Sequence, residues 1–217
     1  MKLHYVVGSP NCRKVHCVIN HLNLDVEFAY LDFFNGDLEK EEFLNINPNK
    51  KVPALSDGSF QLWESNAIMQ YLADTAPENS LYPKNPQVRA DIARWQYWEL
   101  AHYNQALGTV AFESVLKPKF NIGESNQSLI DNGVENLAVY AAVLDAHLSK
   151  RDFLVGNQVT LADYSLICIE AFKDAIPFDW SDYKNLNAYY QRISSQPQWQ
   201  DTAPVSPEAV GHVPEIA

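Results

Sequence analysis

The chain has 217 residues, of which 47% are hydrophobic and 20% are charged, and 27 acidic against 16 basic side chains give a formal net charge of −11. This length allows one large domain or two small ones, each with a buried core. The acidic balance excludes a broad basic face that would neutralise nucleic-acid phosphates, and it disfavours adhesion to an anionic membrane. A small anionic ligand stays compatible with it, provided that local cations and backbone N–H groups hold the charge.

The cysteine pattern and the N-terminus indicate a cytoplasmic protein. Cys12, Cys17 and Cys168 are odd in number and lack zinc-type spacing, so we expect neither a disulfide framework nor a metal site. The first residues lack the basic stretch and apolar core of a secretory signal. No apolar run approaches the ~18 residues of a membrane-spanning helix.

Strand and helix patterns alternate over the first 78 residues. Ser9 before Pro10 predicts a helix start, with a hydroxyl at the N-cap and proline at the first helical position. Asp57-Gly58 between two apolar runs predicts a β-hairpin, after which Ser65 should cap another helix. A crossover followed by a hairpin predicts a small mixed sheet with helices against it. The expected elements are a strand at 3–7, a helix at 13–22, a strand at 26–30, a short helix at 38–44, hairpin strands at 52–55 and 60–62, and a helix from 65.

The rest of the chain carries only helical periods. Apolar residues at steps of three and four predict long helices over 92–110 and 130–148. Thr160 and Asp163 form a capping box at the start of a third helix, and a fourth is expected over 186–193. The sequence therefore predicts an α/β domain at 1–78, a linker at 79–87 with Pro83 and Pro86, and an all-helical domain at 88–217 whose tail after Pro204 is irregular.

Ser9-Pro10-Asn11-Cys12-Arg13 is the first segment that could carry chemistry. A helix N-terminus offers unpaired N–H groups and a partial positive charge, which together stabilise an anion such as a thiolate. The alternative is an ordinary cap in which Cys12 is a small buried residue and Arg13 a surface charge.

Lys50-Lys51-Val52-Pro53 is the second segment. A proline that enters a strand belongs at an edge or bend, and its peptide bond can be cis. The backbone of Val52 could then pair with an extended ligand, as a strand pairs with an added peptide, while the lysines supply cations for a carboxylate. The alternative is an edge proline beside two solvated lysines.

Glu64-Ser65-Asn66 opens the next predicted helix. The hydroxyl of Ser65 and the N–H groups after it would suit a carboxylate, and Glu64 could bind an ammonium group. A ligand with both groups on one carbon, such as the amino-acid end of a peptide, would satisfy the pair. A simple cap without a ligand explains the same residues. Thr160-Leu161-Ala162-Asp163, by contrast, predicts only a structural helix start.

These segments together resemble a cytosolic glutathione transferase of a serine-type class or of a bacterial Thr/Ser-Pro-Asn class. The resemblance rests on segments in the family's order over nearly the whole chain: Ser9 to Arg13, Asn47 to Pro53, Glu64 to Ile68 and Thr160 to Asp163. It implies a thioredoxin-like N-terminal domain, a helical C-terminal domain, glutathione as co-substrate and a homodimer.

The resemblance also assigns roles to residues. Val52, before a proline that is cis in the family, would bind the cysteinyl backbone of glutathione. Glu64 and Ser65 would hold its γ-glutamyl end. Lys50 would meet its glycine carboxylate, although this chain departs here from the commoner Gly-Lys-Val-Pro pattern. Pro53 completes the expected glutathione-binding set.

The thiol contact has three candidates, namely Ser9, Asn11 and Cys12. The serine-type classes place a hydroxyl at Ser9, whereas the Thr-Pro-Asn members favour disulfide reduction and would use the amide of Asn11. We expect Cys12 to be structural, because one turn into the helix it should point away from the ligand. The implied chemistry is a glutathione thiolate of lowered pKa that attacks a small hydrophobic electrophile.

The electrophile pocket is expected around Phe34 and Tyr103, and a catalytic-base role for His102 is disfavoured because no acid partner is evident in the sequence. Three other functions stay open. They are glutathione-dependent reduction of disulfides or peroxides, isomerisation or dehalogenation with glutathione as cofactor, and a non-catalytic regulatory role on the same fold. An intact glutathione motif argues against the last.

Overall fold

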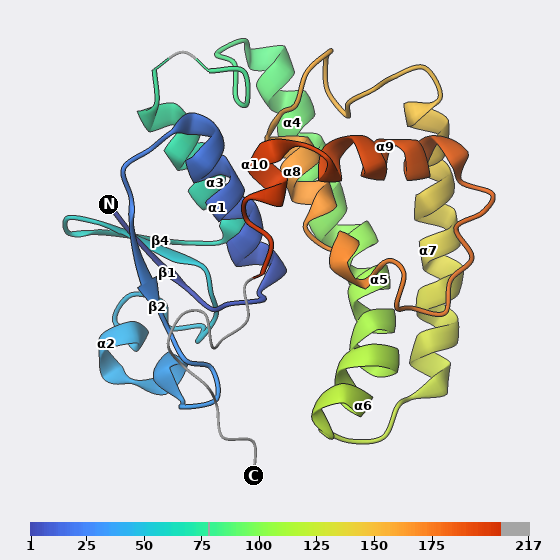
Figure 1. Ribbon diagram of the computed structural model, residues 1–217, viewed down its shortest axis with the longest axis horizontal. Helices are drawn as coiled ribbons and strands as arrows, with labels where there is room; N and C mark the ends of the chain where they lie inside the picture. Colours follow the sequence, from blue (N-terminus) through green and yellow to red (C-terminus); the bar gives the residue numbers. More distant parts are fainter. Residues whose placement is uncertain (78, 205–217) are drawn as a thin grey trace. The chain divides into compact units, whose positions relative to one another are not determined.

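The computed structural model describes residues 1–77 and 79–204, and these divide into two compact units (Figure 1). The first unit contains Met1–Asn79 together with residues 196–204, and the second contains Ser80–Ser195. The sequence predicts residues 196–204 as part of the helical domain. They group with the first unit because Trp199, 1% exposed, lies against the first helix of the chain, a contact that no local pattern reveals.

The first unit contains a mixed sheet of four short strands in the order β2-β1-β3-β4. β1 (Lys2–Tyr5) runs parallel to β2 (Glu27–Tyr30) and antiparallel to β3 (Ala54–Asp57), which pairs with β4 (Phe60–Trp63) through the predicted hairpin. The crossover and hairpin expected from the sequence are therefore confirmed.

Helices α1 (Pro10–Leu22) and α3 (Ser65–Thr75) pack against each other in this unit. Their apolar faces and the sheet form a core in which Val15, Ile68 and Leu72 are fully buried with Leu3 and Leu55 of the strands. This burial supplies the main driving force for folding of the unit, at about 25 cal/mol per Å² of apolar area. The predicted site residues Ser9, Asn11, Glu64 and Ser65 lie at the starts of these two helices.

A smaller apolar cluster forms beside the sheet. Short helices η1 (Asp37–Glu39) and α2 (Glu41–Leu44) bury Leu38 and Phe43 against Ala54 of β3. Val52 packs at the edge of this cluster, so packing holds the segment before β3 in place. The expected short helix over 38–44 is present as these two turns.

The second unit is helical. A nearly continuous helical stretch replaces the predicted helix over 92–110, and it begins at Pro86, inside the expected linker. π-Helical turns interrupt it twice, where one extra residue per turn changes the face presented to the core. The helices are α4 (Pro86–Trp98), η2 (Glu99–Tyr103), α5 (Asn104–Ala111), η3 (Phe112–Leu116), α6 (Lys117–Phe120), α7 (Gln127–Leu148), α8 (Leu161–Ile167), η4 (Glu170–Phe172) and α9 (Lys184–Ser194).

Two features fix the packing of the second unit. A Cβ on Gly133 of α7 would lie 2.6 Å from Cγ2 of Val110, so the glycine allows α5 and α7 to approach closely. The capping box predicted at α8 is confirmed, and buried Asp163 also accepts hydrogen bonds from the backbone N–H of Leu154 at 2.9 Å and from the hydroxyl of Tyr189 at 3.0 Å. The carboxylate thus ties a loop and α9 to the start of α8.

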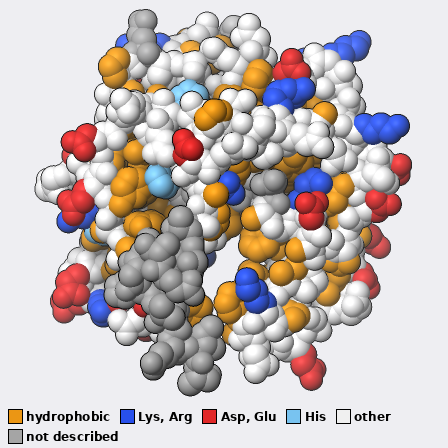
Figure 2. Space-filling model, viewed as in Figure 1, with side chains coloured by type: hydrophobic (Ala, Val, Ile, Leu, Met, Phe, Trp, Pro, Cys, Tyr) orange, Lys and Arg blue, Asp and Glu red, His pale blue; other side chains and the backbone are white. Residues whose placement is uncertain are grey.

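None of the helices that the structure describes is long and apolar enough to cross a membrane. Figure 2 shows both acidic and basic side chains, with hydrophobic side chains among them, on the face that it draws. The predicted irregular tail after Pro204 lies outside the described residues.

Candidate functional site

Ser9 caps α1 as the sequence predicts. Its backbone is extended, and its Oγ accepts a hydrogen bond from the N–H of Cys12 at 3.3 Å. The N–H of Arg13 donates to the Ser9 carbonyl at 3.0 Å, which is the first helical bond of α1. The Ser9 hydroxyl also lies within hydrogen-bond reach of the Cys12 sulfur. A hydroxyl hydrogen rotates freely, so this half-buried group can turn to donate to an anion bound at the start of α1.

Asn11 and Ser65 connect the starts of the two helices. The hydroxyl of Ser65 donates to Oδ1 of Asn11 at 3.2 Å. The predicted role of Ser65 as N-cap is wrong. Glu64 is the N-cap, with φ 72° and no side-chain capping bond, and Ser65 is the first helical residue. Because the backbone turns at Glu64, Ser65 is the first residue of the helix, and from there its side chain reaches Asn11. The local sequence carries no signal for a positive φ at Glu64.

The backbone of Val52 is an open pairing edge. The Val52–Pro53 peptide bond is cis, as predicted. Val52 precedes β3, and its N–H and C=O make no hydrogen bond to any residue that the structure describes. An extended peptide could therefore pair with both groups at this position.

A buried asparagine organises the loop before Val52. Asn47 is 2% exposed, and its Nδ2 donates to the carbonyl of Lys51 at 2.7 Å while its Oδ1 accepts from the N–H of Asn49 at 3.0 Å. These bonds hold the loop in one conformation. Asn47 precedes Pro48, and asparagine before proline is a turn signal that the sequence itself carries.

The two charged residues predicted for the site are exposed. Nζ of Lys50, whose φ is 55°, lies 3.4 Å from Oε1 of Glu39, and the two side chains are 50% and 70% exposed. Such a surface ion pair contributes little to the stability of the fold, so the ammonium of Lys50 is able to change partner. The carboxylate of Glu64 has no partner among the described residues.

Cys12 is 4% exposed, and burial raises the pKa of its thiol to about 11, although the hydroxyl of Ser9 and the backbone at Val6 favour the thiolate. The side chain is therefore a protonated thiol at neutral pH. This burial agrees with a structural interpretation of Cys12.

The two residues predicted for the electrophile pocket differ in exposure. Phe34 is 61% exposed and stacks edge-on with Phe33 in the loop after β2. Tyr103 has no exposed surface, and its hydroxyl is 2.6 Å from that of Tyr190 in the core of the helical unit. Burial also raises the pKa of Tyr103 well above its ordinary value. A side chain so enclosed cannot contact a ligand, so Tyr103 is removed from the pocket.

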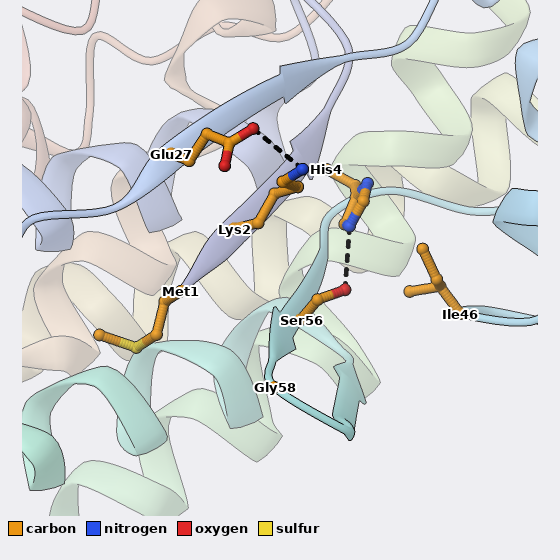
Figure 3. A pocket seen from close by; sticks show the side chains of 7 residues that line it. All are labelled: Met1, Lys2, His4, Glu27, Ile46, Ser56 and Gly58. Atoms are coloured by element: carbon orange, nitrogen blue, oxygen red, sulfur yellow. Dashed lines mark hydrogen bonds and ion pairs between the residues drawn. The ribbon is translucent and has the colours of Figure 1, made fainter.

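Two hollows of the surface contain none of the predicted glutathione-site residues. One lies between α5 and α7 and is lined by the exposed His102, whose ring is 5.5 Å from that of Tyr140. The other lies on the sheet of the first unit (Figure 3), where Lys2 pairs with Glu27 at 2.9 Å and Nε2 of His4 is 3.0 Å from Oγ of Ser56. The polar groups of this second hollow satisfy one another. Among the described residues no group of three or more His, Cys, Asp or Glu side chains could hold a metal ion.

Comparison with known proteins identifies relatives over both units. The family model described as "Glutathione S-transferase, N-terminal domain" matches residues 3–80, and the model of the C-terminal domain matches residues 103–197. Glutathione S-transferase 3 of Zea mays is 28% identical over 212 residues, which cover 95% of each chain.

Solved structures show the same likeness. A delta-class glutathione transferase of Nilaparvata lugens is 30% identical, with a TM-score of 0.80 over 93% of this chain and 92% of that one. A glutathione S-transferase-I bound with lactoylglutathione is 27% identical, with a TM-score of 0.83 over 93% and 97% of the two chains. The match extends over both structural units.

Proposed function

Because the chain belongs to the glutathione S-transferase family, we propose that it holds the thiolate of glutathione at the first turn of α1 and transfers it to a small hydrophobic electrophile. The observation that carries the proposal is the hydrogen bond between Ser65 and Asn11, which places the starts of α1 and α3 side by side. Two helix N-termini thus present their unpaired N–H groups to one anionic ligand.

Four residues of the first unit bind the tripeptide in this proposal. The free N–H and C=O of Val52 pair with the cysteinyl residue of glutathione, before the cis proline Pro53. Glu64 receives the γ-glutamyl ammonium, and the N–H of Ser65 faces the adjoining carboxylate. The exposed ammonium of Lys50 meets the glycine carboxylate. The net charge of −11 does not oppose this, because the ligand's anionic groups meet helix N-termini and a lysine.

Ser9 acts on the sulfur. Its hydroxyl donates a hydrogen bond to the glutathione thiolate and so stabilises the charged form, which lowers the thiol pKa. The positive end of α1 adds to the effect. The thiolate then attacks the electrophilic atom, a carbon–sulfur bond forms, and the leaving group departs with the electron pair. Exposed Phe34 contributes apolar surface for the electrophile.

A reductase activity toward small disulfides is the second candidate. It is favoured by Asn11, because Oδ1 accepts the Ser65 hydrogen bond and the amide nitrogen is left to donate to sulfur. Thiolate attack on a disulfide forms a mixed disulfide with glutathione and releases a thiolate. A second glutathione then attacks the mixed disulfide and releases oxidised glutathione and the second thiolate. A non-catalytic regulatory role does not require the open edge at Val52 or the unpaired Glu64.

Turnover of a chloronitrobenzene and of hydroxyethyl disulfide by wild type and Ser9→Ala tests the proposal. We expect the variant to raise the pKa of bound glutathione by about one unit or more and to lower the conjugation rate roughly tenfold or more. Ser149→Ala is the matched control, because this exposed hydroxyl donates only to the carbonyl of Ala146. Equal rates in wild type and Ser9→Ala would remove Ser9 from the mechanism. Failure of the wild type to bind glutathione in calorimetry would refute the whole proposal.

We further propose a cytoplasmic homodimer, the usual assembly of the family. Light scattering on the purified chain would give about twice the monomer mass of 24.6 kDa, and a monomer mass at micromolar concentration would contradict this.

A further inference from the structure

Arg13 and Trp199 connect the first turn of α1 to the short helix α10 (Pro197–Gln200). Cζ of Arg13 lies 3.9 Å from the centre of the Trp199 ring, and Nη2 donates to the Trp199 carbonyl at 3.1 Å. We propose that this pair positions the thiolate-binding turn, so that α10 belongs functionally to the glutathione site. The inference rests on the proposed role of Ser9.

The contact is specific for a guanidinium group. A planar cation can stack on an indole face and donate an N–H sideways to a carbonyl at the same time. A lysine ammonium is a point charge and cannot satisfy both contacts in one geometry. The indole is 1% exposed, so the cation–π contact is shielded from water and is stronger than a surface one.

Trp199 is itself firmly held. Its carbonyl also accepts a hydrogen bond from Oγ1 of Thr202 at 2.8 Å, and Thr202 is 5% exposed. Figure 1 shows α10 beside α1, and both helices belong to the same compact unit. Arg13 therefore contacts a buried side chain of the same unit.

The pair is linked directly to the proposed catalytic group. The N–H of Arg13 donates to the carbonyl of Ser9 at 3.0 Å, and the N–H of Cys12 donates to the Ser9 hydroxyl at 3.3 Å. Motion of Arg13 therefore displaces Ser9 through one hydrogen bond. Helix ends open most readily, and an error of about 1 Å at a reacting group can cost up to ~100-fold in rate.

Arg13→Lys, Trp199→Leu and the double variant test the inference against Trp199→Phe, which keeps an aromatic ring. We expect the first two to raise the pKa of bound glutathione by about half a unit to one unit and to lower kcat roughly three- to tenfold. KM for glutathione should change less than about twofold, because Val52 and Glu64 still hold the peptide. The kcat of the double variant should be no lower than that of either single variant, because both substitutions break the same contact. Trp199→Phe should keep most of the wild-type kcat.

Arg89→Lys is the matched control. Cζ of Arg89 lies 4.2 Å from the ring centre of Tyr82, and Nε donates to the carbonyl of Pro83 at 3.0 Å, so the contact is of the same kind in the other unit. If the Arg13 and Trp199 variants lower Tm as Arg89→Lys does but leave the thiol pKa and kcat unchanged, the positioning role is refuted. It is also refuted if Arg13→Lys leaves the thiol pKa and kcat unchanged while Arg13→Gln changes them. The positive charge alone would then account for the effect of Arg13.

Amide hydrogen exchange of the ligand-free protein separates this inference from the proposed function. The N–H of Cys12 should exchange faster in Arg13→Lys and Trp199→Leu than in wild type and Arg89→Lys. Unchanged exchange would contradict the link between α10 and the first turn, whether or not the protein binds glutathione. Failure of the wild type to bind glutathione would contradict the proposed function alone.

Discussion

The hydroxyl of Ser65 donates to Oδ1 of Asn11 across 54 positions of sequence, and this bond joins the starts of α3 and α1. Ser65 is 6% exposed and Asn11 is half-buried. Removing one partner of this bond should therefore lower the stability of the folded protein more than removing a partner of an exposed hydrogen bond would.

Asn11→Ala should destabilise the protein by about 1–3 kcal/mol, because it leaves the buried hydroxyl of Ser65 without its acceptor. Ser65→Ala removes the donor and should cost less. Urea unfolding of both variants and of the double variant measures the coupling, expected at about 0.5–1.5 kcal/mol. Strictly additive losses would show that the two helix starts are not coupled through this bond.

Cys12→Ala should keep kcat within about twofold of wild type, because a thiol with a pKa of about 11 carries less than about 0.1% thiolate near pH 7.5. Its reaction with a neutral thiol reagent in the native protein should be far slower than in urea. A loss of kcat of more than about tenfold with unchanged Tm would instead place the sulfur in the mechanism.

Asp163 gives the stability an unusual pH dependence. Burial raises the pKa of its carboxyl from 3.8 to about 6, despite hydrogen bonds from Leu154, Thr160 and Tyr189. The folded state thus binds the proton more tightly than the unfolded state. This contribution to stability is fully present below pH 3.8 and is lost as the pH rises through about 6.

Asp163→Asn tests that dependence. The difference in unfolding free energy between wild type and variant should vary between about pH 4 and pH 6 by on the order of 2–3 kcal/mol. The variant should also be the less stable protein at pH 7, because its amide NH₂ faces backbone donors. A difference independent of pH would show that burial does not shift this carboxyl.

Lys14 of α1 has no exposed surface, and its Nζ has no hydrogen-bond partner among the described residues. A buried charge without a partner carries a desolvation penalty of several kcal/mol, and an apolar side chain of similar size removes that penalty. Lys14→Met should therefore raise Tm, whereas Lys150→Met at an exposed position should not change it. A lower Tm for Lys14→Met would show that the ammonium is paired in solution.

Local signals in the sequence predicted the start of several elements. Ser9 before Pro10, Asp57-Gly58 and the Thr160–Asp163 box act within a few residues of one another, and each forms as predicted. The open backbone at Val52 could also be expected, because proline after it excludes a continuous ladder. Motif order over both domains then identified the family.

Only the tertiary structure decided which side chains meet. The positive φ of Glu64 displaces Ser65 from the cap and sends its hydroxyl to Asn11, and Arg13 finds Trp199 across 186 positions. Helical period showed that Tyr103 lies on an apolar face, and the fold buried that face completely. Caps and turns depend on dihedral preferences of neighbouring residues, whereas these contacts depend on how whole helices pack. The acidic composition excluded a broad phosphate-binding face from the outset, and the fold showed where two helix N-termini could hold a small anion.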